Sequence, residues 1–216
     1  MSELVIKKAI FILGLNGAGK STIRDDITIT KDILIIDPDK IARDSNCNEL
    51  QAGKMAINMF KKAIKNNQSF LVESTLSSNT IIKQIATAKE NNYSVRAYFV
   101  GLESVDYHID RVKNRVSKGG HDIPEATIER RFDKTYGNIK KLFPLVNYLK
   151  VIDNSVIFVT EAKIINGKLK QKKQVCDWVT KHVITPFVEY KLDHTINSTA
   201  HKNFKQNQKQ NSNEIE

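Results

Sequence analysis

Cysteine and glycine are both scarce in this chain of 216 residues, and no apolar run is long enough to span a membrane. The two cysteines, Cys47 and Cys176, belong to no C-x-x-C pair, and no histidine stands at metal-ligand spacing. These absences argue against a disulfide framework and against a zinc site. They favour a cytoplasmic protein in a reducing compartment.

The composition is that of a soluble globular protein, with 40% apolar and 27% charged residues. The length allows one domain, with or without embellishments. The net charge of +10 has two interpretations, solubility or attraction to anionic partners such as nucleotides, phosphosugars or nucleic acid.

Three of only nine glycines fall within six positions, Gly14 to Gly19, where the sequence fits G-x-x-x-x-G-K-[ST]. An apolar run over 9–13 precedes the motif and a helix-compatible run over 22–27 follows it, which is the context of a phosphate-binding loop rather than of a chance turn. Backbone N–H groups and a helix N-terminus would hold phosphates. Lys20 would reach the terminal phosphates and Ser21 would bind Mg²⁺. The predicted nucleotide-binding residues are Gly14, Asn16, Gly17, Ala18, Gly19, Lys20, Ser21 and Thr22.

Apolar strand-like runs alternate with helix-like segments along most of the chain, near 4–13, 33–36, 69–72, 95–102 and 149–152. This alternation predicts a three-layer α/β fold of the P-loop class, with a mainly parallel sheet and helices on both faces. In such sheets the functional site lies beyond the carboxyl ends of the strands.

One domain is expected over 1–192, followed by a mobile polar tail over 193–216 whose few apolar residues cannot order it. Within the domain, Asn166-Gly167 is a hairpin turn signal and predicts a β-hairpin within 156–173. A C-terminal helix is expected over 174–192, interrupted at Pro186.

Acidic and hydroxyl side chains close two of the predicted strands. Asp37 and Asp39 share a face, and one could accept the proton of an attacking hydroxyl while the other caps the helix after Pro38. Spacing alone does not divide these roles, and a Mg²⁺ role for Asp37 is also open. Glu73 and Thr75 suit hydrogen bonds to sugar or alcohol hydroxyls, the alternative being an N-cap for the helix beginning near Asn79.

Two pairs of arginines flank the Gly119-Gly120 loop, and these are Arg111, Arg115, Arg130 and Arg131. A glycine-hinged segment with arginines is typical of a closing lid whose guanidinium groups stabilise phosphoryl transfer. The alternative is a solvated basic helix face. His121 in the loop is either a site residue or a surface residue, and Asn154 either reads the adenine edge or makes a turn.

Taken in order, eight segments resemble the zeta-toxin family of P-loop kinases, in its short stand-alone bacterial branch. They are GLNGAGKST, IDPDKIARD, AGKMA, FLVESTLS, YFVGLES, RVKNRVSKGGHDIPE, IERRF and VIDNS. The resemblance covers about residues 5–155. Leu15 stands where that branch usually has proline, and Asp37-Pro38-Asp39 replaces its usual Asn-Ala-Asp or Asn-Pro-Asp.

The resemblance implies an ATP- and Mg²⁺-dependent kinase, since better-studied members phosphorylate the 3′-hydroxyl of the sugar of UDP-N-acetylglucosamine. It implies nucleotide and Mg²⁺ binding by Lys20 and Ser21, and a general-base role for Asp39. It matches Glu73 and Thr75 to the sugar-contacting segment. It matches the phosphate-clamping arginines to Arg115, Arg111 and Arg130 or Arg131. An antitoxin protein becomes a candidate partner.

Two other functions are compatible with parts of the sequence. The same fold could phosphorylate a nucleoside, a nucleic-acid end or another metabolite, because loop shape determines the acceptor. A nucleotide-gated nucleic-acid-binding protein is disfavoured, since the basic stretches lack interleaved aromatics and no helix-turn-helix pattern is present.

Overall fold

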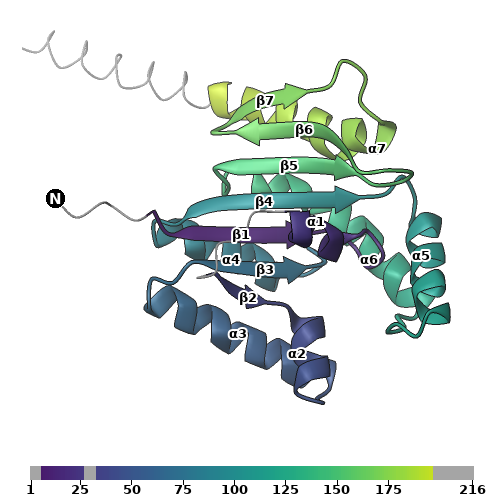
Figure 1. The fold of residues 1–216 in the computed structure, drawn as a ribbon. Helices are drawn as coiled ribbons and strands as arrows, with labels where there is room; N and C mark the ends of the chain where they lie inside the picture. Colours follow the sequence, from purple (N-terminus) through teal and green to yellow (C-terminus); the bar gives the residue numbers. More distant parts are fainter. Residues whose placement is uncertain (1–5, 27–32, 197–216) are drawn as a thin grey trace, which may run out of the picture.

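The computed structural model describes residues 6–26 and 33–196, and a seven-stranded sheet of order β2-β3-β1-β4-β5-β6-β7 lies at its centre (Figure 1). Five strands run parallel, and these are β1 (Lys8–Leu13), β2 (Leu34–Ile36), β3 (Phe70–Ser74), β4 (Ser94–Gly101) and β5 (Tyr148–Asp153). Two antiparallel strands, β6 (Val159–Ile165) and β7 (Lys168–Gln171), extend the sheet. The mainly parallel α/β sheet is as predicted.

The helices connect the strands and cover the sheet. They are α1 (Lys20–Asp26), α2 (Pro38–Asp44), α3 (Glu49–Lys65), α4 (Asn79–Glu90), α5 (Val105–Ser117), α6 (Glu125–Gly137), the 3₁₀ helix η1 (Ile139–Leu142) and α7 (Asp177–Val179). None of the helices in the described part of the chain is long and apolar enough to cross a membrane.

The main core lies on one face of the sheet. Alternate strand residues such as Phe11, Phe70 and Phe99 pack there against α3, α4, η1 and the C-terminal helix. The opposite face carries α1, which packs through Ile23, together with Ala18 of the preceding loop, onto β4 and β5. Because helices lie on both faces, the molecule has the three layers expected from strand–helix alternation.

The C-terminal helix is anchored by Trp178, whose ring lies in the main core and whose Nε1 donates to Asp153 Oδ1 at 2.8 Å. Gly101 allows this approach, because a Cβ there would lie 2.5 Å from the indole ring. α7 continues as a π-turn, η2 (Thr180–Ile184), and then as α-helix over 185–196. One residue, Thr185, separates the π-turn from Pro186, which lacks the N–H that a regular helix would use.

The C-terminal helix includes the first four residues of the segment expected as a polar tail, and 197–216 lie outside the described residues. The turn dipeptide Asn166-Gly167 joins β6 to β7, with φ of 47° and 71° as hairpin turns require.

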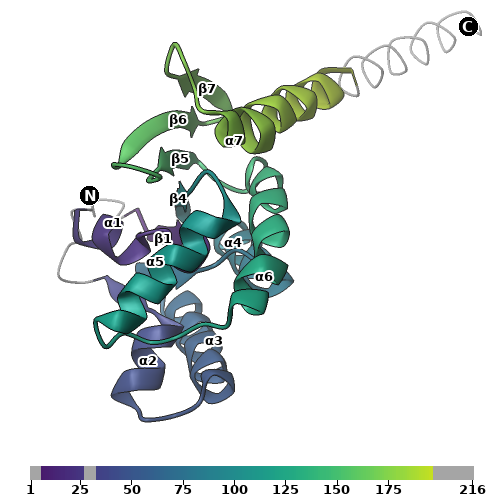
Figure 2. The ribbon, with the colours of Figure 1, turned by 90° about the vertical axis from the view of Figure 1, so that its right-hand side faces the viewer.

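Helices α5 and α6 form an antiparallel pair beyond the carboxyl ends of the strands, and the loop between them runs towards α2 and α3 (Figure 2). A small apolar cluster of Leu15, Ile109, Val112, Ile123 and Ile128 fastens the pair to the loop after β1. The segment predicted as a lid therefore lies at the same end of the sheet as the phosphate-binding motif.

Candidate active site

The loop after β1 is shaped by glycines in conformations that other residues rarely adopt. Gly14 has φ of 146° and a Cβ there would lie 2.2 Å from the Val100 carbonyl oxygen, so the loop passes directly against β4. Gly19 has φ of 96°, and a Cβ there would lie 2.6 Å from Asn154 Nδ2. Both positions therefore require glycine for the loop to take this shape.

The loop presents a set of unpaired donors. In the described chain, the backbone N–H groups of Gly17, Gly19, Lys20 and Ser21 have no hydrogen-bond acceptor. Three of them belong to the start of α1 or the residue before it, where the helix dipole favours an anion. The cradle thus fits the phosphates of a nucleotide. Ser21 and Thr22 are exposed in the first turn of α1, and Ala18 is buried.

Lys20 lies across this cradle, with Nζ 3.4 Å from the carbonyl oxygen of Leu15. Burial lowers the pKa of its amine, while the negative charges of Glu73, Asp39 and Asp37 oppose that shift. The lysine is therefore placed between the phosphate loop and a group of carboxylates.

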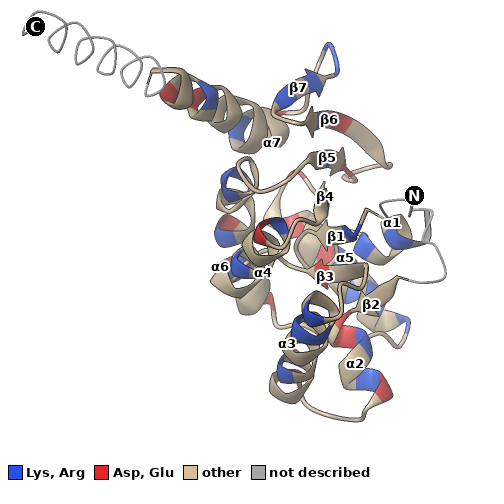
Figure 3. Ribbon diagram, turned by 90° about the vertical axis from the view of Figure 1, so that its left-hand side faces the viewer, with Lys and Arg blue, Asp and Glu red and all other residues tan. Residues whose placement is uncertain are grey.

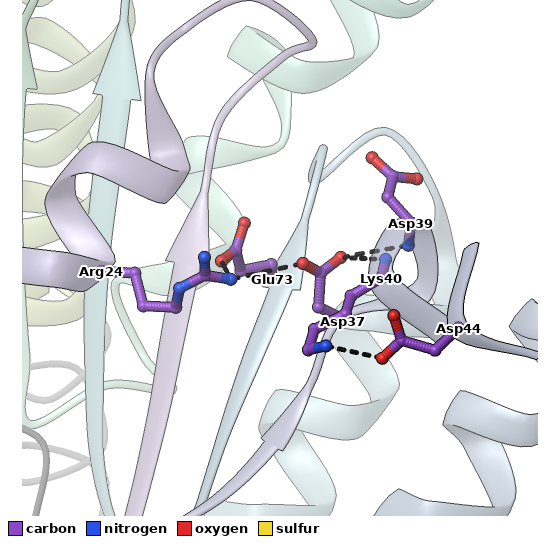
Figure 4. A network of polar contacts seen from close by, with 6 residues as sticks. All are labelled: Arg24, Asp37, Asp39, Lys40, Asp44 and Glu73. Carbon is purple, nitrogen blue, oxygen red and sulfur yellow. Dashed lines mark hydrogen bonds and ion pairs between the residues drawn. The ribbon is translucent and has the colours of Figure 1, made fainter. Parts of the chain in front are cut away.

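The carboxylates come from the ends of β2 and β3. Asp37 Oδ1 accepts from the backbone N–H groups of Asp39 at 3.0 Å and Lys40 at 3.2 Å, which caps α2. The Asp39 carboxylate is exposed and points away from this network (Figure 4). The structure thus divides the two aspartates, with Asp37 as the cap and Asp39 left free.

Glu73 is buried on β3 and forms an ion pair with Arg24 Nη1 at 2.7 Å. Burial raises the pKa of its carboxyl and Asp37 raises it further, whereas Arg24 and Lys20 lower it. Neither Glu73 nor Thr75 caps α4, whose N-cap is Ser78. Thr75 Oγ1 lies 2.8 Å from Ser77 Oγ.

Arg24 was missed by sequence reasoning. From α1 it reaches Asp37 Oδ2 at 3.3 Å as well as Glu73, so it holds together the acids that end β2 and β3 (Figure 4). With these contacts both oxygens of Asp37 have protein partners. The available signal was an arginine one turn after Lys20, on a helix that must pack beside those strand ends.

A cavity of about 560 Å³ opens between the phosphate loop, α2, the start of α3, the end of β3 and the loop over 118–124 that joins α5 to α6, here called the lid loop. Its walls include Asn16, Lys20, Asp37, Asp39, Glu73, Thr75, His121 and Arg131. Residues far apart in the sequence, predicted separately as phosphate-binding, acidic and lid residues, therefore share one cavity.

The four predicted arginines have different positions. Arg131 lines the cavity and donates to Asn16 Oδ1 at 3.2 Å, whereas Arg130 is exposed and outside the cavity wall. Arg111 donates to the carbonyl oxygens of Asn154 at 2.5 Å and Ser155 at 3.2 Å, beside the phosphate loop rather than in the cavity.

Arg115 holds the lid loop in place, since Nη2 donates to the carbonyl oxygen of His121 at 2.5 Å. In the described chain its Nε is buried without a hydrogen-bond partner, and its charge lowers the pKa of Lys20. His121 itself is exposed, with Nε2 3.6 Å from Glu49 on α3. Its ring thus links the lid loop to the far wall of the cavity.

Asn154 is buried against the phosphate loop, where Nδ2 donates to the carbonyl oxygen of Ala18 at 2.8 Å. Its amide thus supports the loop backbone. A contact between Asn154 and a nucleotide base remains a prediction.

A second support was not predicted. His108 on α5 is fully buried, with Nδ1 2.8 Å from the carbonyl oxygen of Asn16 and Nε2 3.1 Å from the hydroxyl of Tyr136. Desolvation lowers the pKa of His108 to about 4, so the ring is neutral near pH 7 and Nδ1 carries the proton donated to Asn16. The Tyr136 hydroxyl accepts from the Leu102 N–H at 2.8 Å, and its single proton is shared between the Leu102 carbonyl at 2.6 Å and His108 Nε2.

Comparison with known proteins shows which family this sequence matches. A family model described as Zeta toxin matches residues 3–170. A protein of Haemophilus influenzae described as uncharacterized is 41% identical over 132 residues, covering 58% of this chain and 92% of that protein.

Two solved structures share the fold. A chain of the AvrRxo1-ORF1:AvrRxo1-ORF2 complex with sulphate ions has a TM-score of 0.61 at 15% identity, covering 79% of this chain and 62% of its own length. The same complex has been solved with ATP. A chain of the PezAT chromosomal toxin-antitoxin system of Streptococcus pneumoniae has a TM-score of 0.51 at 18% identity, covering 72% of this chain and 71% of its own. The present chain spans less than two thirds of the AvrRxo1 chain.

Proposed function

The chain belongs to the zeta toxin family, and on that premise we propose that it is an ATP- and Mg²⁺-dependent kinase that transfers the γ-phosphate to a sugar hydroxyl. The phosphate loop, the fold and the family support a phosphotransferase of the P-loop kinase type. The preferred acceptor is UDP-N-acetylglucosamine, as the family resemblance implies.

One observation carries the proposal. Lys20 of the phosphate loop and Asp39 of α2 line the same cavity, so a phosphate held by the loop and a hydroxyl held near Asp39 would face each other. The cavity volume of about 560 Å³ falls within the range of small-molecule sites. A proton-accepting carboxylate beside a phosphate cradle is what phosphoryl transfer to an alcohol needs.

On the donor side, ATP with Mg²⁺ would supply the transferable phosphoryl group and neutralise charge on its oxygens. The N–H groups of Gly17, Gly19 and Lys20 would hold the phosphates, and the Lys20 amine would contact the terminal ones. The exposed hydroxyl of Ser21 is the proposed metal ligand. Asp37 is less suited to that role, because both its oxygens already have protein partners.

On the acceptor side, Asp39 would accept the proton of the attacking hydroxyl. Glu73 and Thr75 would hydrogen-bond the neighbouring hydroxyls of the sugar. Arg131, which lines the cavity, and Arg115, whose charge acts on Lys20, would stabilise negative charge as the phosphoryl group transfers.

Acceptors other than a nucleotide sugar keep the same chemistry and change only the fit to the cavity wall. A nucleoside, a nucleic-acid end or another metabolite is the second candidate class. The PezAT system is a toxin-antitoxin system, which supports an antitoxin as a proposed partner of this chain as well.

The test is incubation of the full chain with ATP, Mg²⁺ and a panel of acceptors, followed by mass spectrometry of the products. A phosphorylated UDP-N-acetylhexosamine supports the proposal, and a product only from another acceptor moves the assignment to the second class. Failure of every acceptor, or an undiminished rate in Asp39→Asn, contradicts the proposed chemistry.

A further inference from the structure

Part of one sheet face is not covered by any described helix. On β4 to β7, residues such as Phe99, Val151, Ile164 and Leu169 face the main core, so the residues between them face the side of α1. α1 packs over Val100 and Ile152, towards the carboxyl ends of β4 and β5. Figures 1 and 2 show the remainder of this face open in front of β5, β6 and β7.

The open face is strongly basic. Its strand positions carry six cationic side chains, which are Lys8, Arg96, Lys150, Lys163, Lys168 and Lys170. Apart from Glu161, which lies at the bulge of β6 and accepts from Lys172 Nζ and the Cys176 N–H, no strand position on this face of β1 or of β4 to β7 carries Asp or Glu. The described residues form no ion pair with any of the six. Figure 3 shows basic residues along most of β7.

Three of these lysines stand in one row. Lys150 of β5 pairs with Lys163 of β6, which pairs with Lys170 of β7. Neighbouring strands lie about 5 Å apart, and like charges placed directly opposite each other destabilise a sheet. The row thus carries an unfavourable repulsion that an extended polyanion would relieve.

Two aromatic rings lie beside the row on the same face. Tyr98 and Tyr148 have ring centroids 5.7 Å apart and are partly exposed. The Arg96 guanidinium lies over the Tyr148 ring at 4.8 Å from its centroid. Cations combined with partly exposed rings are the two elements that single-stranded nucleic acids need, since phosphates contact the former and bases stack on the latter.

We propose that this face, defined by the six cations with Tyr98 and Tyr148, binds single-stranded nucleic acid, with phosphates on the lysine row and bases against the tyrosines. A duplex fits less well, because its bases are stacked on one another and are not available to stack on the tyrosine rings. An anionic membrane also fits less well, because no large exposed apolar side chain of the described chain lies on β4 to β7. The inference concerns a surface outside the cavity and does not depend on the kinase reaction.

The test measures fluorescence anisotropy of labelled oligothymidylate and oligouridylate of about 20 nucleotides with the full chain, from about 50 mM to about 200 mM KCl. Wild-type binding is expected to weaken with salt. The variant Lys150→Gln/Lys163→Gln/Lys170→Gln is expected to bind at least tenfold more weakly and to lower the log–log salt slope by about 2, since each phosphate contact contributes about 0.7.

The matched control is Lys61→Gln/Lys83→Gln/Lys140→Gln, which removes the same charge from exposed helix positions and is expected to bind within about twofold of wild type. Tyr148→Leu keeps the apolar packing and removes the stacking ring. It is expected to weaken oligonucleotide binding roughly tenfold while leaving binding of heparin, which has no bases, unchanged.

Three results overturn the proposal. One is no oligonucleotide binding by the wild type at the lowest salt, and another is an equal loss in the two lysine triples. The third would assign the face to a membrane. In that result the wild type binds vesicles containing phosphatidylserine, and Lys150→Gln/Lys163→Gln/Lys170→Gln abolishes vesicle binding but still binds the oligonucleotides. The rate of phosphoryl transfer by Lys150→Gln/Lys163→Gln/Lys170→Gln is expected to equal that of wild type, so the surface and the cavity are tested separately.

Discussion

At the scale of single residues, the two aspartates at the start of α2 are expected to have different roles, one in stability and the other in catalysis. Asp37→Ala removes the cap and an Arg24 contact, and is expected to lower the free energy of unfolding by about 1–2 kcal/mol. Asp39→Asn is expected to leave stability within about 0.5 kcal/mol, since Asp39 is exposed, but to lower kcat about 100-fold or more. Urea unfolding and steady-state kinetics on both variants check this, and an active Asp39→Asn enzyme would assign the base elsewhere.

The Arg24–Glu73 pair gives a prediction that depends on pH. The pKa of Glu73 is raised above its usual 4.5, and such a carboxyl lowers stability as pH rises through that raised value. Arg24→Met raises the Glu73 pKa further, so the variant is expected to lose more stability at about pH 8 than at about pH 5. The loss at the higher pH is expected near 2 kcal/mol, below that of a fully buried pair because the Arg24 side chain keeps 22% of its surface exposed.

The double variant Arg24→Met/Glu73→Gln is the control for this pair. It removes the unpaired carboxyl, and is expected to recover stability at high pH and to lose the pH dependence. Chemical unfolding at both pH values measures the effect. Equal losses in Arg24→Met at the two pH values would show that Glu73 does not depend on Arg24.

Some residues of the site could be predicted from the sequence. Asp39, Glu73 and Lys20 could be predicted because each ends a strand or completes a motif, and they do share a cavity. Their catalytic roles stay predictions. Arg24 could not be predicted, because its partners lie 13 and 49 residues away and only the packing of α1 brings them together.

At the scale of elements, His108 connects α5 to the phosphate loop and, through Tyr136, to α6. Its pKa of about 4 lies below the usual 6.5, so the neutral ring stabilises the fold above about pH 6.5 and that stability is lost as pH falls towards 4. The difference between these two pKa values corresponds to about 3 kcal/mol in the free energy of unfolding.

In His108→Gln this titration disappears, and the free energy of unfolding is expected to change less between about pH 4 and about pH 6.5 than in wild type. His121→Gln, at an exposed position of the lid loop, is the matched control and is expected to follow the wild-type profile. Denaturant unfolding across this range measures both. An unchanged profile in His108→Gln would remove His108 as the origin of the acid sensitivity.

The strands and helices could be predicted well where the hydrophobic periodicity and the turn-forming residues indicated the same boundaries, as in β3 or at the Asn166-Gly167 turn. Pro186 signals an irregularity in the C-terminal helix but not that it takes the form of a π-turn, and the bulge between Val151 and Ile152 carries no local signal. The open basic face was also hidden. Its six cations are spread over β1 and β4 to β7, with at most two on any one strand, so only the pairing of the strands gathers them on one face.

At the scale of the whole molecule, nucleotide binding is expected to stabilise the fold. A non-hydrolysable ATP analogue with Mg²⁺ at about 100 times its Kd contributes about 2.7 kcal/mol, which raises Tm by roughly 5–10 °C for a chain of this size. Lys20→Met and removal of Mg²⁺ by a chelator are each expected to reduce the shift. Thermal unfolding measures it, and an equal shift in Lys20→Met would place the nucleotide outside the cradle.

The overall architecture was predictable because alternating strands and helices admit few arrangements. The prediction of a three-layer, mainly parallel P-loop fold is confirmed, and so is membership of the zeta toxin family. The strand order and the placement of the lid against α3 could not be derived, because they depend on contacts such as His121 with Glu49 between distant segments.

Helix α1 begins in the proposed donor cradle and, one turn later, holds the acids of the proposed acceptor wall through Arg24. Binding in one half of the site is thus coupled through α1 to the geometry of the other half. The two substrates should consequently enter with synergy, each raising the affinity for its counterpart by the same factor. Such reciprocity would restrain idle hydrolysis of ATP while the acceptor is missing.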